Sequence, residues 1–563
     1  MDTDVLIIIP ARGGSKGIPR KNLRILAGHP LIWYVIQTSK KASCHIVVTT
    51  EDEEIAEVAE TYGAQVIARP KALAEDDIPL DPVILHAWAQ SERKWQTIFN
   101  WVITIQPTSP LISTKTIKDA LAYAQTKNLD SCLAVSDARA LYWGGSTSAP
   151  YPHFQERLNR QWLPAFWKET GGIVISNRKL LLQGQRIGGK TGLYPIPNQE
   201  SIDIDSYDDL VVAEHRIQAP KVAIRTIGNQ QLGLGHVYRT LTLASRLFTP
   251  HLDFYVDSSS SLAAQLIKDH NYPVYNVTND NNFIAIIESK GYDLIINDIL
   301  DTNSEYITRL RQNNKRVVVN FEDLGSGATE ANLVINALYE YTTPLPNQKF
   351  GWQYVCLREE FLRAYYEPKA NPQAKNLLIT FGGADPGNLT CLALQAAAEA
   401  LGNCNAELDV VIGLGNPRIQ EISTLVDQVS KCFSDLRLHT HVKRMSSLMH
   451  RADLAITSNG RTVFELASCG VPMISISQNY REASHTFGRL NGGVIDLGLA
   501  EHVTIAQLAQ NIRDVWLAPE KRLQMQASLL MFDFRKGVDR VIRCIKETYL
   551  DWRNQHYDFS TTL

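Results

Sequence analysis

Basic side chains and glycines gather in one short stretch near the start of the chain. The stretch is "PARGGSKGIPRKNL", residues 10–23, with the glycine pair Gly13 and Gly14 and the basic residues Arg12, Lys16, Arg20 and Lys21. Bare glycine backbone lets a ligand approach closely. A basic surface turn would have the same composition. The stretch directly follows the apolar run "DVLIII" (4–9), however, and ligands bind open α/β sheets at such strand ends, so we expect a polyphosphate site.

Two carboxylates stand two residues apart in "SIDIDSYDDL" (201–210). On a strand, residues i and i+2 point to one face, so Asp203 and Asp205 would lie roughly 6.5–7 Å apart along the backbone. Mg²⁺ takes one or two carboxylates together with phosphate oxygens and waters. The pair therefore predicts a magnesium site. For Asp208 and Asp209, which open a helical pattern, we expect capping or solvation instead.

A second glycine-rich turn contains a histidine. In "AIRTIGNQQLGLGHVYRTLTLA" (223–244), Gly233 and Gly235 open the turn and His236 begins the helix. An imidazole titrates near neutrality and can act as a general base. A single histidine at such a place is more often structural, for example as a helix cap, so both interpretations stay open.

Alternating strands and helices must position these residues. The apolar runs "DVLIII", "HIVVTT" (45–50), "AQVIA" (64–68) and "FNWVITIQ" (99–106) alternate with helical patterns, which indicates an α/β fold with a parallel sheet. Fresh first strands follow at "KVAIRT" (221–226) and "NLLIT" (376–380). We expect one Rossmann-like domain at 1–218. Two further Rossmann-like halves at 221–365 and 375–545 would form a second unit.

The bulk composition is that of a globular protein of several domains. The chain has 563 residues, a formal net charge of -3 and eight cysteines without a CxxC pair. The charge gives no sign of nucleic-acid or anionic-membrane binding. Scattered thiols suit a reducing cytosol, and no signal peptide or membrane-length apolar run is visible. We therefore expect a cytoplasmic enzyme with small-molecule substrates.

Five ordered motifs in the first part of the chain resemble those of the acylneuraminate cytidylyltransferases, also called CMP-sialic acid synthetases. They are "IIPARGGSKGIPRKNL" (8–23), "RPKALAEDDIP" (69–79), "QPTSPL" (106–111), "NRQWLPAFW" (159–167) and "SIDIDSYDDL" (201–210). This family transfers CMP from CTP to a nine-carbon 2-keto sugar acid and releases pyrophosphate. The resemblance thus implies that the anomeric hydroxyl of a nonulosonic acid attacks the α-phosphorus of CTP, with Mg²⁺ as cofactor.

The resemblance also assigns roles to individual residues. Arg12 and Lys21 would hold the CTP phosphates and stabilise the charge on the leaving pyrophosphate. The CTP site would further include Gly13, Gly14, Ser15, Lys16, Asn22, Arg69 and Asp76. The sugar acid would meet Gln106, Ser109, Arg160 and Gln161. Asp203 and Asp205 would hold the metal.

Two segments depart from the pattern of this family. Glu51 in "TTED" (49–52) stands where the family usually has aspartate, and "ETGG" (169–172) stands where the sialic acid enzymes usually have Asn-Gly. These departures leave the identity of the sugar acid open, with pseudaminic and legionaminic acids as examples. Because related enzymes pair through the region matching about 140–170, which is rich in large apolar residues here, we also expect a homodimer.

The rest of the chain resembles the UDP-sugar hydrolase of the pseudaminic acid pathway, which has a glycosyltransferase-B-type (GT-B-type) fold. The resemblance implies that the two Rossmann-like halves form a GT-B-like unit behind an N-terminal nucleotidyltransferase domain. The resemblance rests on the His236 segment, on "LLITFGGADPGNLT" (377–390) and on "ADLAITSNGRTVFELASCGVPMISI" (452–476). It implies that His236 acts as general base on a water that displaces UDP from a UDP-linked acetamido sugar. Gly460, Arg461 and Thr462 would meet the diphosphate and Glu465 the ribose.

The second resemblance also has departures. "NGRT" (459–462) replaces the more usual Gly-Gly-Ser-Thr, and "NFEDL" (320–324) replaces a double-aspartate segment. A glycosyltransferase, a UDP-sugar 2-epimerase and a non-catalytic sugar-nucleotide binding module therefore stay open as alternatives for this unit.

Overall fold

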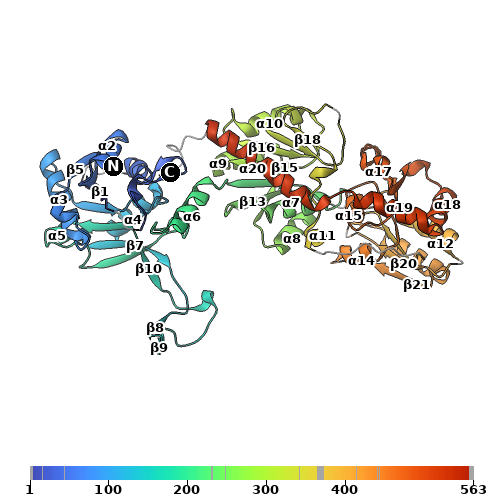
Figure 1. Cartoon of the computed structure of the whole chain (residues 1–563), viewed down its shortest axis with the longest axis horizontal. Helices are drawn as coiled ribbons and strands as arrows, with labels where there is room; N and C mark the ends of the chain where they lie inside the picture. Colours follow the sequence, from blue (N-terminus) through green and yellow to red (C-terminus); the bar gives the residue numbers. More distant parts are fainter. Residues whose placement is uncertain are drawn as a thin grey trace. The chain divides into compact units, whose positions relative to one another are not determined.

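The computed structural model of the chain describes residues 4–14, 17–42, 45–229, 232–247, 249–341, 343–363, 373–383, 385–402, 404–413, 415–440, 442 and 444–556. The described residues up to Ala219 form one compact unit and those from Pro220 onward form a second (Figure 1). Within these ranges, no helix combines the length and the apolar character needed to cross a bilayer.

A mixed sheet of seven described strands forms the centre of the first unit, in the order β11-β7-β10-β6-β1-β4-β5. The strands are β1 (Val5–Pro10), β4 (His45–Thr50), β5 (Gln65–Ala68), β6 (Trp101–Ile105), β7 (Ser131–Asp137), β10 (Trp167–Asn177) and β11 (Thr191–Pro195). The prediction of a parallel sheet is wrong for one strand, because β10 runs antiparallel to β6 and β7. The chain leaves β7 and returns through β10 like a long hairpin, which requires opposite strand directions.

Strand β1 is buried on both faces, which explains its continuous apolar run. Val5, Ile7 and Ile9 belong to one core cluster of the unit, and Leu6 and Ile8 to another on the opposite face. The larger α-helices of this unit are α1 (Leu31–Ala42), α2 (Glu53–Thr61), α3 (Leu80–Trp95), α4 (Thr114–Thr126) and α6 (Tyr207–Gln218), with the short α5 at Arg178–Leu181. The end of β1 is thus held rigidly where the basic loop begins.

An arm extends from the sheet of the first unit between β7 and β10. It contains the hairpin β8 (Trp143–Ser146) and β9 (Ala149–Pro152) and the 3-10 helix η3 (Arg160–Trp162). Figure 1 shows this hairpin standing away from the body of the unit. Large apolar side chains of the arm are exposed rather than packed into a core of the unit.

The first half of the second unit is a parallel sheet in the order β14-β13-β12-β15-β16-β17-β18. Its strands are β12 (Val222–Thr226), β13 (Leu252–Asp257), β14 (Val274–Val277), β15 (Leu294–Asp298), β16 (Val317–Phe321), β17 (Leu333–Asn336) and β18 (Gln348–Phe350). Its helices are α7 (Gly235–Ala244), α8 (Ser261–Asp269), α9 (Asp280–Lys290) and α10 (Ser304–Arg311). Strand order reverses beside β12, which is where ligands bind in such sheets.

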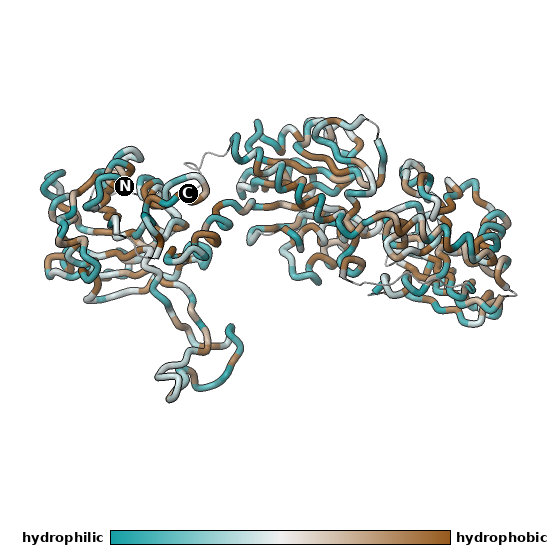
Figure 2. The backbone as a smooth tube through the Cα atoms, viewed as in Figure 1, coloured by the Kyte–Doolittle hydropathy of each residue, from teal (hydrophilic) through white to brown (hydrophobic). Residues whose placement is uncertain are grey.

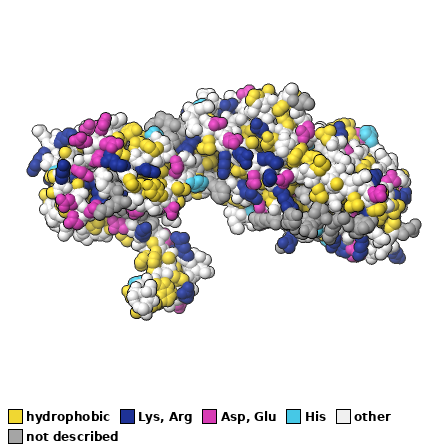
Figure 3. Space-filling view, in the orientation of Figure 1, with side chains coloured by type: hydrophobic (Ala, Val, Ile, Leu, Met, Phe, Trp, Pro, Cys, Tyr) yellow, Lys and Arg dark blue, Asp and Glu magenta, His cyan; other side chains and the backbone are white. Residues whose placement is uncertain are grey.

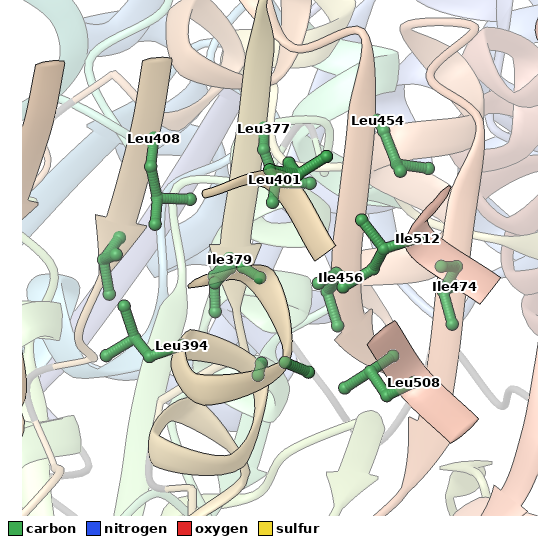
Figure 4. Close-up of a cluster of buried hydrophobic side chains, with 14 of the residues drawn as sticks. Leu377, Ile379, Leu394, Leu401, Leu408, Leu454, Ile456, Ile474, Leu508 and Ile512 are labelled. Atoms are coloured by element: carbon green, nitrogen blue, oxygen red, sulfur yellow. The ribbon is translucent and has the colours of Figure 1, made fainter. Parts of the chain in front are cut away.

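The second half repeats this design with a sheet in the order β21-β20-β19-β22-β23-β24. Its strands are β19 (Asn376–Thr380), β20 (Glu407–Val411), β21 (Asp435–His439), β22 (Leu454–Ser458), β23 (Met473–Ser477) and β24 (Val494–Leu499). Helices α12 (Leu389–Leu401) and α18 (Ile505–Trp516) cover one face of the sheet, where Figure 4 shows Leu394 and Ile512 beside Ile379 and Ile456. The predicted pair of Rossmann-like halves is confirmed, and with it the α/β fold class.

The remaining helices follow the strands of the second half. They are α13 (Ile419–Val429), α14 (Met445–Arg451), α15 (Thr462–Ser468), α16 (Tyr480–Ala483), α17 (Phe487–Leu490) and α19 (Pro519–Leu530). In Figure 2 the strands of the sheets are mostly brown, while the helices alternate between brown and teal, as expected when helices cover a sheet.

Two segments cross between the halves of the second unit. In one of them, Leu338, Val355 and Phe361, the last in α11 (Glu359–Arg363), pack with residues of the second half in a shared core. Helix α20 (Gly537–His556) returns to the first half, where Val538 and Val541 join the core cluster of Val222. The sequence-based boundary of 375–545 assigned much of this helix to the second half, whereas its apolar face packs against the first.

Candidate functional sites

The basic loop follows β1 directly, as predicted, and it is held by acidic neighbours. The Gly13 N–H donates to Glu51 Oε1 at 2.8 Å. A Cβ at Gly13 would lie 2.3 Å from Asp52 Oδ2, whereas nothing lies within 4 Å of such an atom at Gly14. A side chain at position 13 would therefore displace Asp52, whereas position 14 has open space beside it. Ser15 and Lys16, both predicted to bind nucleotide, lie outside the described residues.

Lys21 joins the basic loop to the carboxylate pair. Its Nζ donates to the carbonyl of Ile204 at 2.8 Å and to Asp205 Oδ1 at 3.0 Å. Asn22, the next residue, uses its side-chain amide to hold the Arg12 carbonyl at 2.9 Å. Lys21 therefore links the loop to the carboxylate pair, while Asn22 holds the backbone of the loop.

The carboxylate pair does not lie on a strand, which corrects the sequence-based expectation. Residues 201–205 form a segment without regular secondary structure before α6, anchored by the Ile204 N–H, which donates to the Thr108 carbonyl at 2.8 Å. Alternation survives, because Ile204 is buried while Asp203 is half-buried and Asp205 exposed. Asp209 forms a capping box with Ser206, which confirms its expected role as a cap.

The electrostatics of this pair suit a divalent cation. Burial raises the pKa of Asp203, a hydrogen bond from Thr108 opposes that shift, and the negative charge of Asp205 adds to it. A cation between the two carboxylates would relieve their repulsion. Among the described residues no group of three or more His, Cys, Asp and Glu side chains could hold a metal, so a bound ion would need phosphate oxygens and waters as well.

Asp76 and Arg69, which are also predicted for the CTP site, lie beside the loop that contains Arg12. Arg12 Nη1 pairs with Asp76 Oδ1 at 2.8 Å, with both side chains partly exposed. Arg69 is buried, and its Nη2 donates to the Thr49 carbonyl at 2.7 Å. Burial lowers the pKa of Arg69, and the charge of Glu51 opposes this shift. Arg12 is thus a partly exposed cation paired with Asp76, whereas Arg69 is a buried cation tied to the end of β4.

Residues predicted to face the sugar acid meet the segment "ETGG". Gln106 Nε2 donates to the Gly171 carbonyl at 3.1 Å. A Cβ at Gly171 would lie 3.5 Å from Asp203 Oδ2, and one at Gly172 would lie 3.1 Å from Ser109 Oγ. The two glycines therefore bring Gln106 and Ser109 close to the carboxylate pair.

The other two residues predicted for the sugar acid lie on the arm. Arg160 and Gln161 form part of η3, and Arg139 Nη1 donates to the Gln161 carbonyl at 3.4 Å. Hydrogen bonds from Arg139, with the nearby charge of Arg160, lower the pKa of Asp137 to about 2. Among the described residues, neither Arg160 nor Gln161 hydrogen bonds to the phosphate loop or the carboxylate pair.

The second unit places His236 at the start of α7 beside a buried aspartate. His236 Nδ1 lies 2.6 Å from Asp298 Oδ1 at the end of β15. Burial opposes ionisation of Asp298, but the charges of Arg239 and His236 outweigh it and hold the pKa of this carboxyl below its ordinary range. An ionised carboxylate can only accept, so Nδ1 donates to Asp298, and this contact fixes the orientation of the imidazole ring. The N-cap position of α7 is occupied by Leu234, whose side chain makes no cap hydrogen bond. His236 is the second residue of the helix and therefore does not serve as its cap.

Sequence reasoning did not assign the residues behind His236. Arg239 donates to both oxygens of Asp298 at 2.5 and 2.6 Å and to Glu322 Oε1 at 2.8 Å. All three side chains are buried. The available signals were the aspartate that ends the apolar run "LIIND" (294–298) and the arginine one turn after His236. The histidine is thus oriented by a fixed chain of charges.

Residues predicted for the nucleotide diphosphate lie at the start of α15. Thr462 begins this helix, and the Arg461 side chain turns toward the first half, where its Nη2 donates to the Cys356 carbonyl at 3.0 Å. A Cβ at Gly460 would lie 3.4 Å from Glu482 Oε1. Burial raises the pKa of Glu482 to about 7. The sequence reasoning did not single out this acidic residue beside the diphosphate loop.

Glu465, predicted to accept from the ribose, already has a partner. Arg358 Nε donates to Glu465 Oε1 at 2.6 Å, and Arg358 Nη2 donates to Glu465 Oε2 at 3.0 Å. Such a bidentate pair fixes the plane of the carboxylate. A ribose hydroxyl would therefore have to share this carboxylate with Arg358, which the spacing of "NGRTVFE" did not reveal.

Comparison with known proteins agrees with the arrangement of the first unit. A family model described as cytidylyltransferase matches residues 6–144. The chain is 33% identical over 220 residues to zebrafish N-acylneuraminate cytidylyltransferase A. The aligned stretch covers 37% of this chain and 50% of that protein. It is 32% identical over 228 residues to a post-translational flagellin modification protein B of Campylobacter coli, covering 38% and 96% respectively.

Other comparisons reach into the second unit. Spore coat polysaccharide biosynthesis protein SpsG of Bacillus subtilis is 26% identical over 340 residues, or 58% of this chain and 98% of that protein. This stretch is longer than the first unit and so extends over the second. The crystal structure of Acinetobacter baumannii MurG aligns with 58% of the chain at a TM-score of 0.44 and 15% identity. The chain spans about half the length of the zebrafish relative. On the match to the Campylobacter protein over nearly its whole length, the chain belongs to the cytidylyltransferase family.

Proposed function

We propose that the first unit transfers CMP from CTP to a nonulosonic acid and releases pyrophosphate. The observation that carries the proposal is Lys21, whose ammonium joins the glycine loop to the carboxylate pair through Asp205. Gln106 and the two glycines of "ETGG" lie on the other side of this pair. These contacts support a proposal in which phosphate, metal and sugar acid would meet at Asp203 and Asp205.

The reaction on these residues is a displacement at the α-phosphorus of CTP. Asp203 and Asp205 would hold a Mg²⁺ ion, which would neutralise phosphate charge when bound. Arg12 and Lys21 would hold the phosphates and stabilise the negative charge that builds on the leaving pyrophosphate. Gln106 and Ser109 would position the keto acid so that its anomeric hydroxyl lies in line with the leaving group. The test is pyrophosphate release from CTP, Mg²⁺ and a panel of nonulosonic acids.

Lys21→Ala should slow CMP transfer by roughly 10²-fold or more, the scale seen when one preorganised charge-stabilising group is lost. Steady-state kinetics of pyrophosphate release would measure this effect. Lys118→Ala, which removes an exposed lysine on α4, serves as the matched control. If only the KM for CTP rose while kcat stayed unchanged, Lys21 would be a plain binding residue and its proposed role would be wrong.

The second unit we infer to be a UDP-sugar hydrolase. The supporting observation is the His236–Asp298 contact of 2.6 Å, which leaves Nε2 free to take a proton from water. Water would then displace UDP from the anomeric carbon of an acetamido sugar. A glycosyltransferase or epimerase would use the same pair of halves. Release of UDP and free sugar without an acceptor would support hydrolysis, and a need for an acceptor would reject it.

We further propose that the chain forms a homodimer through the arm. Trp143, Tyr151, Trp162 and Phe166 are all more than half exposed, and Figure 3 shows hydrophobic side chains gathered on this arm. Aromatic residues are enriched in interfaces. Trp162→Glu should shift the mass in solution from dimer to monomer in light scattering after gel filtration. Leu182→Glu, at an equally exposed site outside the arm, should not. A fully active monomer of the unmodified chain would contradict the proposal.

A further inference from the structure

A cavity between the two halves of the second unit has polar and apolar walls. Glu322 and Arg461 line it together with Leu338, Val355, Leu357 and Phe464. The cavity adjoins the candidate base, since a Cβ at Gly235, the residue before His236, would lie 3.3 Å from Arg461 Cδ. A group in this cavity would therefore be attached close to the carbon on which the His236-activated water acts.

One acceptor and one donor in this cavity are buried and unused. Glu322 Oε1 accepts from Arg239, and Arg461 Nη2 donates to the Cys356 carbonyl. The other atoms of these groups, Glu322 Oε2 and Arg461 Nη1, have no hydrogen-bond partner among the described residues. The Glu322 side chain is almost completely buried. Buried polar atoms of this kind are normally hydrogen-bonded. The described residues supply no partner for either atom, so a bound group would have to supply both.

The backbone holds Glu322 in this position at a cost. Its φ of 52° lies in the left-handed region, which is unusual for glutamate. The Ala337 N–H also donates to Glu322 Oε1 at 3.3 Å, so that oxygen is already used twice. Strained backbone of this kind often marks residues that serve a ligand. The two bonds to Oε1 hold the carboxylate, so Oε2 is a buried, positioned acceptor at the cavity wall.

The charges around the cavity favour a neutral ligand group. Arg239 is paired with both Asp298 and Glu322, and Glu465, which also lines the cavity, is paired with Arg358. With the cation of Arg461, the three arginines and three carboxylates balance. A carboxylate or phosphate in the cavity would leave a negative charge unpaired. The missing partner must instead offer one N–H or O–H donor and one acceptor, with apolar atoms toward Leu338, Val355 and Phe464. A secondary amide with a methyl group has all three properties.

We propose that Glu322 and Arg461 recognise the N-acyl group on the sugar carbon next to the anomeric carbon. The amide N–H would donate to Glu322 Oε2, Arg461 Nη1 would donate to the amide carbonyl, and the methyl group would contact the apolar wall. This inference rests on the proposed nucleotide-sugar site and names the residues that select its substrate. Both residues lie in the two segments, "NFEDL" and "NGRT", that depart from the resembled family.

Binding measurements on the full chain test this without turnover. Titration calorimetry would compare UDP-N-acetylglucosamine and UDP-N-acetylgalactosamine with UDP-glucose, UDP-galactose and UDP. We expect the unmodified chain to favour at least one acetamido sugar over its hydroxyl counterpart by about tenfold or more, because the hydroxyl compound leaves buried partners unpaired. Arg461→Met should reduce this preference, measured as the ratio of the two affinities on the same variant, to about twofold or less.

Control variants separate the possible outcomes. Arg418→Met removes an arginine that donates to backbone carbonyls in the second half and should keep the preference. If Arg461→Met does not fold, as judged by its melting curve, Glu322→Gln takes its place with the same expectation. Binding of UDP compounds without any preference for the acetamido sugars would overturn the inference. The cavity would then be explained as a site for a water molecule. Loss of UDP binding in Arg461→Met would also overturn it, since Arg461 would then serve the diphosphate. If no UDP compound binds, the proposed hydrolase fails as well.

Discussion

Asp205→Asn is expected to abolish CMP transfer while the first unit stays folded. The amide keeps the size of the side chain but removes the charge that a bound Mg²⁺ requires. Asp205 is exposed, and the described contact of its side chain is the ion pair with Lys21. Its backbone N–H, which donates to Asp209 at 3.1 Å, is unaffected by the change. The loss of activity should therefore come without loss of the capping box that starts α6.

Pyrophosphate release at saturating Mg²⁺ measures this effect, and the melting temperature reports on the fold. Asp208→Asn is the matched control, because Asp208 lies in the same acidic stretch, is exposed and stands in the first turn of α6. It should keep nearly full activity. Turnover close to normal in Asp205→Asn would reject the metal site.

His236→Asn is expected to remove UDP-sugar hydrolysis and to leave CMP transfer almost unchanged. An amide cannot take a proton from water, and the transfer reaction belongs to the other unit. Affinity for UDP should survive, because Gly460, Thr462 and Glu465 lie in the second half of the unit. The amide introduced by this substitution could still donate to Asp298, so a large loss of stability is not expected.

Hydrolysis, UDP affinity and melting temperature would be measured on one preparation of this variant. His251→Asn, an exposed histidine in the same half, provides the control and should hydrolyse normally. Hydrolysis retained in His236→Asn would contradict the assignment of the base. If the unmodified chain hydrolyses none of a panel of UDP-linked acetamido sugars, the unit is better explained as a binding module.

Local patterns in the sequence predicted correctly the strand and the loop that carry the first site. The run at β1 and the loop behind it lie where the alternation of strands and helices placed them. The "DID" segment shows why alternation succeeds and strand assignment fails. Ile204 is buried between two carboxylates, as it would be on a strand, but the segment pairs with the Thr108 carbonyl through a single bond. Period-two burial needs only an extended chain, whereas a strand needs a neighbour.

Long-range contacts explain what the sequence could not show in the second unit. Arg239 and Asp298 are far apart in the chain, and so are Arg358 and Glu465, yet each pair is joined by two hydrogen bonds. The motif around His236 indicated a candidate base but not the carboxylate that fixes its tautomer. The left-handed backbone at Glu322 is equally invisible, because glutamate gives no local signal for it.

The return of α20 to the first half has a consequence for how the second unit is made. Val541 and Ile545 complete a core whose other members come from strands synthesised much earlier, such as Val222 and Phe254. At ordinary ribosome speeds, that core would wait roughly ten to forty seconds for its last helix. During this interval its apolar surface has no cover and would be exposed to chaperones and to aggregation. The unit should therefore refold as one cooperative body rather than as two separable halves.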